Sequence, residues 1–249
     1  MISNINKLSV LIPARNEAEN LPECVQEIVK ELNKNKIKYE VIIIDDGSED
    51  NTNRIVRELI KVYPSVVYFR NNGKNGFGNA VRLGLNKFNG DAVAIMMADR
   101  SDSPLDLVKY WNTLQDGYEC VMGSRFIHGG KVINYPKVKL IVNRIVNMLI
   151  KYAFKIDTND ITNAFKMYRR EVILGCQPLI SPHFNLTVEI PLKAIIRGYS
   201  WKVVPISWKN RQKGEAKLKL KEMGSRYFFI VAYLWLEKYF SRGDYKRKR

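Results

Sequence analysis

The run Ala94-Ile95-Met96-Met97-Ala98-Asp99-Arg100-Ser101-Asp102-Ser103-Pro104 passes abruptly from apolar residues to an acidic loop. Its apolar half predicts a buried strand, and its acidic half places carboxylates directly after that strand. Open α/β sheets bind their ligands at the carboxyl ends of the strands. The stretch therefore predicts both an α/β fold and the position of a site.

Apolar runs alternate with helical patterns on both sides of this stretch. Strands are expected at residues 8–12, 39–44, 66–69 and 119–123. Helices are expected from residue 17 to about 34, from a cap at Asp50 or Asn51 to about 62, and up to Leu85. This alternation predicts a mainly parallel central sheet with helices on both faces.

The pattern changes in the second half of the chain. Residues 137–155 predict a helix with a narrow polar stripe and a wide apolar face, and residues 185–196 predict another helix. Residues 201–206 predict an edge strand because they contain Pro205. A basic loop and helix start are expected over 209–221, before an apolar run at 227–236 that is too short to cross a bilayer. We expect one domain over residues 1–220, including the amphipathic helix at 137–156, and an apolar helix with a basic tail over 221–249.

Charge and cysteine content restrict the class of protein. The chain has 249 residues, with 41 Lys and Arg against 25 Asp and Glu, a net charge of +16. This charge predicts an acidic partner: phosphate groups, nucleic acid or an anionic membrane face. Three widely spaced cysteines argue against a disulfide framework or a zinc site, and favour a reducing cytoplasm. With no signal peptide or spanning segment in the pattern, the protein is expected to be soluble or to lie on a membrane.

The acidic and glycine-rich loops each allow two interpretations. Asp45 and Asp46 can bind a nucleotide base or ribose, or form an Asx-turn with a helix cap. The loop at 73–78 can cradle a phosphate, although a plain loop is the better interpretation. Asp99 and Asp102 can offer oxygen ligands to Mg²⁺ or Mn²⁺. For Asp102 we favour a different role, as the N-cap of a helix that begins at Pro104.

Several other polar residues are assigned no catalytic role on pattern alone. Basic residues in different segments can recognise phosphates, but a solvated surface is the default for them: Arg125, Arg144, Arg211 and Lys217. His128 and His183 lack metal-ligand spacing and are expected to be structural or on the surface. Glu189 lies among apolar residues. It could act as a base or be a structural group with all its hydrogen bonds satisfied, and we do not assign it to catalysis.

The order of the motifs is more specific than any one of them. They are IPARNEAENL (12–21), IIDDGSEDNT (43–52), GFGNA (76–80), the stretch at 94–104, GSRF (123–126) and RQKGEAKL (211–218). Together they resemble family 2 glycosyltransferases, in particular the branch of dolichol- or polyprenyl-phosphate mannosyltransferases and glucosyltransferases. The resemblance covers residues 8–220 and implies a GT-A fold that takes a hexose from a nucleotide diphosphate donor.

The resemblance also implies roles for individual residues. Those implied for the nucleotide pocket are Pro13, Arg15, Glu17, Ile43, Asp45 and Asp46. Ala98 and Asp99 would face the diphosphate and the metal, and Arg125, Arg211 and Lys217 would contact phosphates. Arg144 and Asn147 correspond to acceptor-side residues. Of these, Asp99, Arg125 and Arg211 are expected to act in catalysis.

The chain departs from the family at one position. The family usually has Asp-x-Asp where this sequence has Met97-Ala98-Asp99, so one expected carboxylate is missing. We then expect Mg²⁺ or Mn²⁺ to bind more weakly than in proteins with Asp-x-Asp, or to use Asp102 as a second ligand. Alternatively, Arg100 supplies part of the positive charge, or the chain is an inactive module that binds a nucleotide sugar.

The implied acceptor is a polyprenyl phosphate, dolichyl or undecaprenyl. Its phosphate is already largely anionic near pH 7, because the second pKa of a phosphate monoester is about 6, so no strong base is needed. In-line attack would invert the anomeric configuration. The apolar helices would hold the protein on an anionic cytoplasmic membrane face as a peripheral protein; alternatively they pack on the core or in a homodimer. Another lipid or a glycan remains an alternative acceptor, and the acidic strand ends argue against nucleic acid as the partner.

Overall fold

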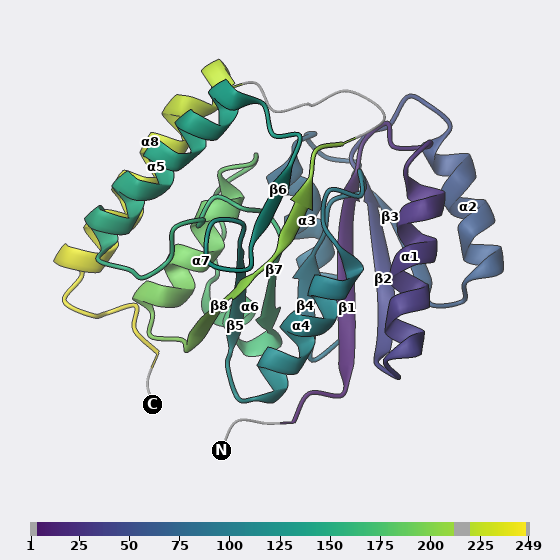
Figure 1. The fold of residues 1–249 in the computed structure, drawn as a ribbon, viewed down its shortest axis with the longest axis horizontal. Coiled ribbons are helices and arrows are strands. Elements are labelled where there is room, and N and C mark those ends of the chain that lie inside the picture. The colour runs from purple at the N-terminus through teal and green to yellow at the C-terminus, as the bar shows by residue number, and fades with distance from the viewer. Residues whose placement is uncertain (1–3, 212–219, 248–249) are drawn as a thin grey trace.

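The computed structural model describes residues 4–211 and 220–247 (Figure 1). Among these residues, seven strands form one sheet in the order β3-β2-β1-β4-β7-β5-β8. Their bounds are β1 (Lys7–Ala14), β2 (Lys38–Asp45), β3 (Val66–Arg70), β4 (Ala92–Ile95), β5 (Cys120–Ser124), β7 (Lys166–Arg169) and β8 (Trp201–Pro205). The predicted strands are confirmed, and β8 lies at the edge as its proline indicated.

The sheet is parallel except at β7, which runs antiparallel to both β4 and β5. The sequence pattern did not predict this strand, because Lys166 and Arg169 break its apolar run. Both side chains are nevertheless buried, and both are bound by backbone carbonyls: Arg169 donates to the carbonyls of Tyr118 at 2.9 Å and Leu114 at 2.6 Å. Hydrogen bonds to carbonyls make these buried polar groups tolerable.

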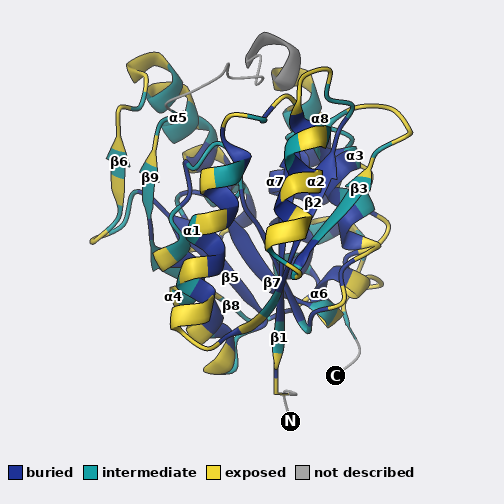
Figure 2. Cartoon of the chain, turned by 90° about the vertical axis from the view of Figure 1, so that its right-hand side faces the viewer, coloured by how far each residue is buried: buried dark blue, intermediate teal, exposed yellow. Residues whose placement is uncertain are grey.

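Alternate residues of the central strands enter two cores, one on each face. Val10 and Ile12 of β1 pack on the face covered by α1 (Leu21–Lys34), α2 (Thr52–Val62) and α4 (Pro104–Gln115). Leu11 packs on the other face, with α3 (Phe77–Leu85), α6 (Arg170–Gly175) and α7 (Leu186–Ile196). This alternation follows from the two-residue period of a strand. In Figure 2 the strands of the sheet are coloured mostly as buried, whereas the helices that cover them carry exposed residues.

Two long helices, α5 (Lys137–Phe154) and α8 (Leu220–Phe240), lie side by side and outside α7 (Figure 1). They run in the same direction, and the Tyr239 hydroxyl donates to the Ala153 carbonyl at 3.1 Å near their ends. The helix predicted at 137–155 is thus confirmed. Among the helices that the structure describes, none is long and apolar enough to span a membrane.

A smaller pairing lies beside the main sheet. β6 (Lys131–Ile133) and β9 (Ser207–Lys209) form a two-stranded parallel ribbon, and Asp102 makes an isolated bridge to Trp208. The sequence did not predict this ribbon, because three residues are too few for a periodic pattern. Its position brings the chain that leads to Arg211 beside the acidic loop after β4. The three cysteines are free and buried, in agreement with the prediction that they form no disulfide framework.

Candidate active site

The carboxyl ends of β1, β2 and β4 meet at one edge of the sheet. The backbone N–H of Asp46 donates to the carbonyl of Ala14 at 2.8 Å, and that of Met96 donates to the carbonyl of Leu11 at 3.0 Å. The segments that begin at Arg15, Asp46 and Met96 therefore start side by side. This is the edge at which open α/β sheets bind ligands.

A cluster of three charged residues occupies this edge. Arg211 donates through Nη2 to Glu17 Oε1 at 2.8 Å, and its Nε lies 3.6 Å from Asp99 Oδ2. Glu17 also accepts from the side-chain amide of Asn20 at 2.6 Å. The structure thus brings together three residues that the family resemblance singled out, although 194 positions separate Glu17 from Arg211. An arginine held between carboxylates can exchange them for the oxygens of a diphosphate.

Asp45 and Asp46 are both engaged within the protein. Asp45 accepts from the backbone N–H of Ser48 at 2.7 Å and from the Tyr68 hydroxyl at 2.9 Å. Burial, and then the Asp45 hydrogen bond, raise the pKa of Tyr68 to about 12. Asp46 accepts from the side chain of Asn71 at 2.8 Å and from the backbone N–H of Gly76 at 2.7 Å. The turn interpretation therefore accounts for the Asp45 contact to Ser48.

The glycines at 76 and 78 are explained by close packing. A Cβ atom at Gly76 would overlap the carbonyl of Pro182, and one at Gly78 would overlap the carbonyl of Ser181. The N–H of Gly76 is bound by Asp46 rather than turned toward an anion. The loop at 73–78 thus joins Asp46 to the segment before α7.

Other residues assigned to the nucleotide pocket lie at the same edge with different exposure. Ile43 and Ala98 are buried in the core on the α1 face, and Pro13 is buried within β1. Arg15 is half-buried directly after β1. Its neighbour Asn16 is tied to the loop after β2, since the N–H of Asn16 donates to the Ser48 hydroxyl at 2.9 Å.

Arg125 forms a buried ion pair with Asp160. Its Nε and Nη2 donate to the two carboxylate oxygens at 2.7 and 2.6 Å, and its backbone N–H donates to the same carboxylate at 3.0 Å. Burial acts to lower the pKa of Arg125, but the hydrogen bond and charge of Asp160 raise it above its ordinary value. The rings of Phe126, Tyr135 and Trp208 surround the guanidinium at 5.2–5.7 Å. Arg125 is therefore a fixed positive charge with a neutralising partner.

The polar stripe of α5 faces inward. The Asn147 side chain, 1% exposed, donates to the Thr162 hydroxyl at 2.8 Å and accepts from the Thr162 N–H at 3.1 Å. Arg144 donates to the carbonyl of Asn159 at 3.0 Å and lies 4.4 Å above the ring of Phe126. The same segment, residues 157–163, thus holds Arg125, Arg144 and Asn147 in one region.

The loop after β4 corrects the prediction for Asp102. Ser103, not Asp102, occupies the N-cap of α4. Asp102 instead accepts from the backbone N–H of Met97 at 3.1 Å, and its side chain is buried. Burial raises the pKa of Asp102 to about 7. The cap prediction failed because α4 begins at Pro104, which makes Ser103 the residue before it, while Asp102 accepts from Met97 instead.

Arg100 does not bring its charge to the site. It forms ion pairs with Glu23 and Glu27 of α1. Lys217 lies outside the described residues. Glu189 is a satisfied structural group, because it accepts from the N–H groups of Ile180 and Ser181, both at 2.8 Å, and from Lys193 at 2.7 Å.

Comparison with known proteins agrees with this geometry. The family model described as glycosyl transferase family 2 matches residues 9–174. The chain belongs to this family. It is 34% identical over 220 residues to a dolichol-phosphate mannosyltransferase of Pyrococcus furiosus, covering 86% of this chain and 60% of that protein. It is 30% identical over 215 residues to a polyprenol monophosphomannose synthase of Mycolicibacterium smegmatis, covering 84% of this chain and 80% of that protein.

Solved structures show the fold of this family 2 glycosyltransferase. Glucosyl-3-phosphoglycerate synthase from Mycobacterium tuberculosis, in complex with Mn²⁺ and UDP-glucose, matches with a TM-score of 0.68 at 18% identity. The match covers 94% of this chain and 79% of that one. The same enzyme in complex with Mn²⁺, UDP and glucosyl-3-phosphoglycerate also gives a TM-score of 0.68, again with 94% of this chain covered and 80% of that one. The predicted GT-A fold is confirmed.

Few side chains in the loop around Asp99 can act as metal ligands in this family 2 chain. Within residues 4–211 and 220–247, no three His, Cys, Asp or Glu side chains converge as a metal-binding group. Met97 offers a soft thioether, which Mg²⁺ and Mn²⁺ do not favour, and Asp102 is turned inward. Asp99 remains, and proteins commonly hold Mg²⁺ through one or two carboxylates together with substrate phosphates. The residues therefore fit a metal that binds together with a diphosphate.

Sequence reasoning missed the residues that organise the basic side of the site. Asp160 and Thr162 hold Arg125 and Asn147, respectively, yet neither was singled out. The available signal was a polar run, Asp157 to Asp160, between the apolar residues Ile156 and Ile161. Without knowledge of the packing around it, such a polar run predicts an exposed loop. Asp160 is in fact fully buried.

Proposed function

We propose that this chain transfers a hexose from a nucleotide diphosphate sugar to a polyprenyl phosphate. One observation carries the proposal: α5 turns Arg144 and Asn147 toward the segment 157–163, which also holds Arg125, and exposes an apolar surface on its other side. An acceptor with a phosphate head and a hydrocarbon chain matches this helix, because the phosphate suits its polar side and the chain suits its apolar side. The names of the Pyrococcus and Mycolicibacterium relatives support the same acceptor class.

The donor is proposed to bind across the carboxyl ends of β1, β2 and β4. The residues assigned to the nucleotide are Pro13, Arg15, Glu17, Ile43, Asp45 and Asp46, and Ala98 lies beside the diphosphate. Ile43 and Ala98 are buried, so they shape the pocket from behind. Glu17 and Asp45 are the carboxylates proposed to accept from the hydroxyl groups of a ribose, which would replace some of the partners that they have within the protein.

Asp99 is proposed to hold Mg²⁺ or Mn²⁺ together with the donor diphosphate. Such an ion neutralises the negative charge that develops on a departing nucleoside diphosphate. Arg211 is placed to add a fixed positive charge there, since its guanidinium lies 3.6 Å from Asp99. We assign Lys217 to the same phosphates by the family resemblance.

Arg125 and Arg144 are proposed to hold the acceptor phosphate near the donor. Two anions repel each other, so their approach requires fixed cations, which the segment at 157–163 keeps in place. The acceptor needs little help from a base, because its second pKa is about 6. Attack on the face opposite the leaving group would invert the anomeric centre.

The outer surface of α5 and α8 is proposed to rest on an anionic cytoplasmic membrane face. The exposed apolar side chains on the two helices are Val138, Ile141, Val142, Ile145, Met148, Leu149, Tyr152, Phe228, Phe229, Tyr233, Trp235, Leu236, Tyr239 and Phe240. An apolar surface of this extent marks a membrane or protein interface. The net charge of +16 favours an anionic bilayer over a second, equally basic copy of the chain.

A panel of UDP- and GDP-hexoses with undecaprenyl and dolichyl phosphates tests the proposal, with and without Mg²⁺ or Mn²⁺. The expected product is a polyprenyl phosphate hexose, identified by mass. Binding of a nucleotide sugar without transfer to any polyprenyl phosphate would contradict the proposal. It would favour another lipid or glycan acceptor, or the inactive module that Met97 suggests.

A further inference from the structure

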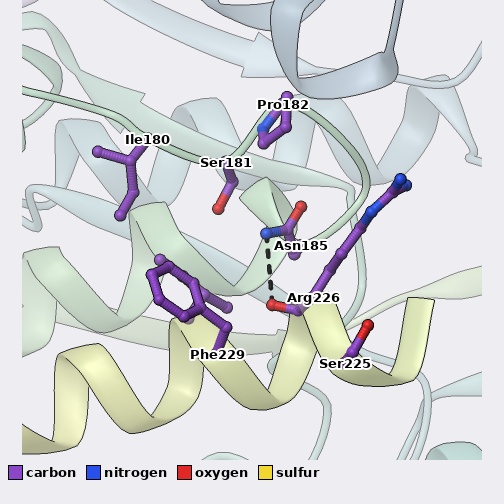
Figure 3. A pocket seen from close by; sticks show the side chains of 8 residues that line it. Ile180, Ser181, Pro182, Asn185, Ser225, Arg226 and Phe229 are labelled. Carbon is purple, nitrogen blue, oxygen red and sulfur yellow. Dashed lines mark hydrogen bonds between the residues drawn. The ribbon is translucent and has the colours of Figure 1, made fainter. Parts of the chain in front are cut away.

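Two features of the described residues lie apart from the site residues assigned so far. One is a pocket of about 350 Å³ beside α8, in whose lining the side-chain amide of Asn185 donates to the carbonyl of Arg226 at 3.5 Å (Figure 3). Ile230 of this pocket packs in the core on the face of the sheet opposite to α1. The other feature is Arg100, which adjoins Asp99 and so bears directly on the proposed metal site.

Arg100 adopts a backbone conformation that is unfavourable for its residue type. Its φ of 59° lies in the left-handed region, where the Cβ atom of an L-residue is crowded by the following carbonyl oxygen. Such a conformation persists only where the surrounding contacts fix it, and it is found most often at functional sites. The contacts of the Arg100 side chain should therefore account for the shape of this loop.

The guanidinium of Arg100 is bound by two carboxylates of α1. Its Nε donates to Glu27 Oε2 at 3.3 Å, its Nη2 pairs with Oε1 of the same residue, and its Nη1 pairs with Glu23. Glu23 and Glu27 are four residues apart on one face of the helix, where their charges repel each other unless a cation lies between them. The hydrogen bond of Glu27 raises the pKa of Arg100 above its ordinary value, although burial acts to lower it.

The loop after β4 is held from two sides. On one side α1 is a firm support for Arg100, because Leu21 and Ile28 of this helix are fully buried against the sheet. On the other side the N–H of Lys209 donates to the carbonyl of Ser101 at 3.1 Å. The loop is thus tied to α1 at Arg100 and to β9 at Ser101.

The carboxylate of Asp99 takes its direction from this backbone. Its Oδ1 accepts from the N–H of Ser101 at 3.1 Å, and its Oδ2 lies 3.6 Å from the guanidinium of Arg211. The direction of the carboxylate therefore depends on where the backbone of Arg100 and Ser101 is held. Because Met97 supplies no second carboxylate, metal affinity should depend strongly on the orientation of this one side chain.

We propose that Arg100 is a positioning residue for Asp99. By pairing with Glu23 and Glu27 it fastens the loop after β4 to α1, and so keeps the Asp99 carboxylate turned toward the metal and the diphosphate. This inference rests on the proposed function, which assigns Asp99 to the metal. Arg100 acts through the position of a ligand and not through its own charge, which the carboxylates of α1 neutralise.

Arg100→Gln tests the inference, because it removes the ion pairs to α1. Mn²⁺ binding is measured by calorimetry in the presence of UDP or GDP. Arg100→Gln should weaken it by about tenfold, which is typical when a group that orients a metal ligand is lost. Arg54→Gln is the matched control: Arg54 pairs with Glu58 on α2 at 3.1 Å and its side chain is 77% exposed, so its loss should change Mn²⁺ binding by less than about twofold. Equal affinities for the two variants would overturn the inference.

The direction of the effect distinguishes positioning from charge. Loss of a positive charge near a cation would by itself tighten Mn²⁺ binding, so a weaker affinity indicates a displaced ligand. If Arg100 attracted the diphosphate directly, Arg100→Gln would also weaken UDP or GDP binding in the absence of metal. We expect metal-free nucleotide binding to change by less than about twofold, because the charge of Arg100 is neutralised on α1. A tenfold loss there would rule out the positioning role.

Arg100→Gly provides a second variant that does not strain the backbone. Glycine adopts a positive φ without steric cost, so this variant keeps the loop conformation accessible while it loses the ion pairs. It should weaken Mn²⁺ binding by about tenfold as well. Wild-type affinity in Arg100→Gly would mean that Asp99 is held without α1, contrary to the inference.

The carboxylates of α1 test the same contact from its other side. In a Glu23→Gln/Glu27→Gln protein, Mn²⁺ binding should already be weakened. Adding Arg100→Gln to this protein should change it by less than about twofold, because the three groups act as one unit. A further tenfold loss would contradict the inference, since Arg100 would then act independently of α1.

The same measurements separate this inference from the proposed function. If the wild-type protein transfers no sugar but Arg100→Gln weakens Mn²⁺ binding as described, the positioning role stands and the transferase proposal fails. If the wild-type protein transfers sugar and Arg100→Gln binds Mn²⁺ normally, the transferase proposal stands and the positioning role fails. A wild-type protein that binds no Mn²⁺ with either nucleotide would also exclude the positioning role, because Asp99 would have no metal to hold.

Discussion

The backbone N–H of Met97 donates a hydrogen bond to the carboxylate of Asp102 at 3.1 Å. In this contact the side chain of Asp102 faces the protein interior. Asp102 is the residue that the sequence suggests as a second metal ligand beside Asp99. Met97 itself is half-exposed and stands where the family resemblance implies a carboxylate. We therefore propose Asp99 as the carboxylate of this loop that holds a metal bound with a diphosphate.

Replacing Met97 by aspartate should strengthen metal binding. A second carboxylate adds charge and a hard oxygen ligand, so Met97→Asp should tighten Mn²⁺ binding in the presence of a nucleoside diphosphate by roughly tenfold. Met97→Asn is the matched control, because it adds an oxygen without the charge. Calorimetric titration of Mn²⁺ measures the difference, and equal affinities for the two variants would contradict this account of the loop.

Removing the charge of Asp160 should destabilise the protein strongly. Asp160→Asn leaves Arg125 buried without its counter-charge, at a cost of about 3–5 kcal/mol in the free energy of unfolding. Asp157→Asn is a control from the same segment. The Asp157 side chain is 95% exposed in its ion pair with Lys151, so its loss should cost less than about 1 kcal/mol. Urea unfolding measures both, and similar small losses would show that the Arg125 pair does not brace this region.

Lys166 should give stability a specific pH dependence. Burial lowers its pKa to about 7 in the folded protein, against the ordinary value of 10.5. Between these values the unfolded chain binds a proton that the folded protein does not, so the unfolding free energy should rise with pH. From pH 7 to about pH 9, wild type should gain about 2 kcal/mol more than Lys166→Met. Urea unfolding across this range measures the difference.

Parallel pH profiles for wild type and Lys166→Met would contradict this reasoning. They would mean that the ammonium group stays charged among the carbonyls of Ile161, Asn163 and Thr187, to which it donates. Both proteins contain the same other titrating groups, so only the difference between their slopes is attributed to Lys166.

A charge on the outer surface of α5 should weaken membrane binding. Leu149 is 62% exposed, so Leu149→Glu should fold normally while reducing sedimentation with phosphatidylglycerol vesicles by about tenfold. Val62 of α2 is 66% exposed, and α2 covers the opposite face of the sheet, so Val62→Glu serves as the control. Equal binding by the two variants would contradict the membrane proposal. A dimeric wild type that becomes monomeric in Leu149→Glu would assign this surface to a homodimer instead.

Local periodicity predicted most of the fold. The strands at β1, β2 and β4 are continuous apolar runs because both of their faces are buried. The helix at 137–155 was predicted from its spacing, but its polar stripe faces inward, toward Thr162. Spacing reveals that two faces differ, whereas their orientation depends on residues that are distant in sequence.

The misses have the same physical origin. β7 carries Lys166 and Arg169, whose burial is tolerable only because carbonyls from other segments surround them. Asp102 has the local pattern of a helix cap, yet its hydrogen bond is to Met97. The site residues Glu17, Asp99 and Arg211 could be named from ordered motifs, but their contacts depend on the fold. Asp160 could not be named, because nothing local distinguishes it from the exposed Asp157.

Transfer of a radiolabelled hexose into organic-extractable undecaprenyl phosphate tests the central claim most directly. Wild-type protein should form the labelled lipid in vesicles, and Asp99→Asn should reduce the rate by about 100-fold or more, since an electrostatic group at the reacting centre is lost. Asp116→Asn, at the exposed C-terminal end of α4, should retain the wild-type rate. Labelled lipid formed equally by wild type and Asp99→Asn, or no labelled lipid from any donor, would contradict the account.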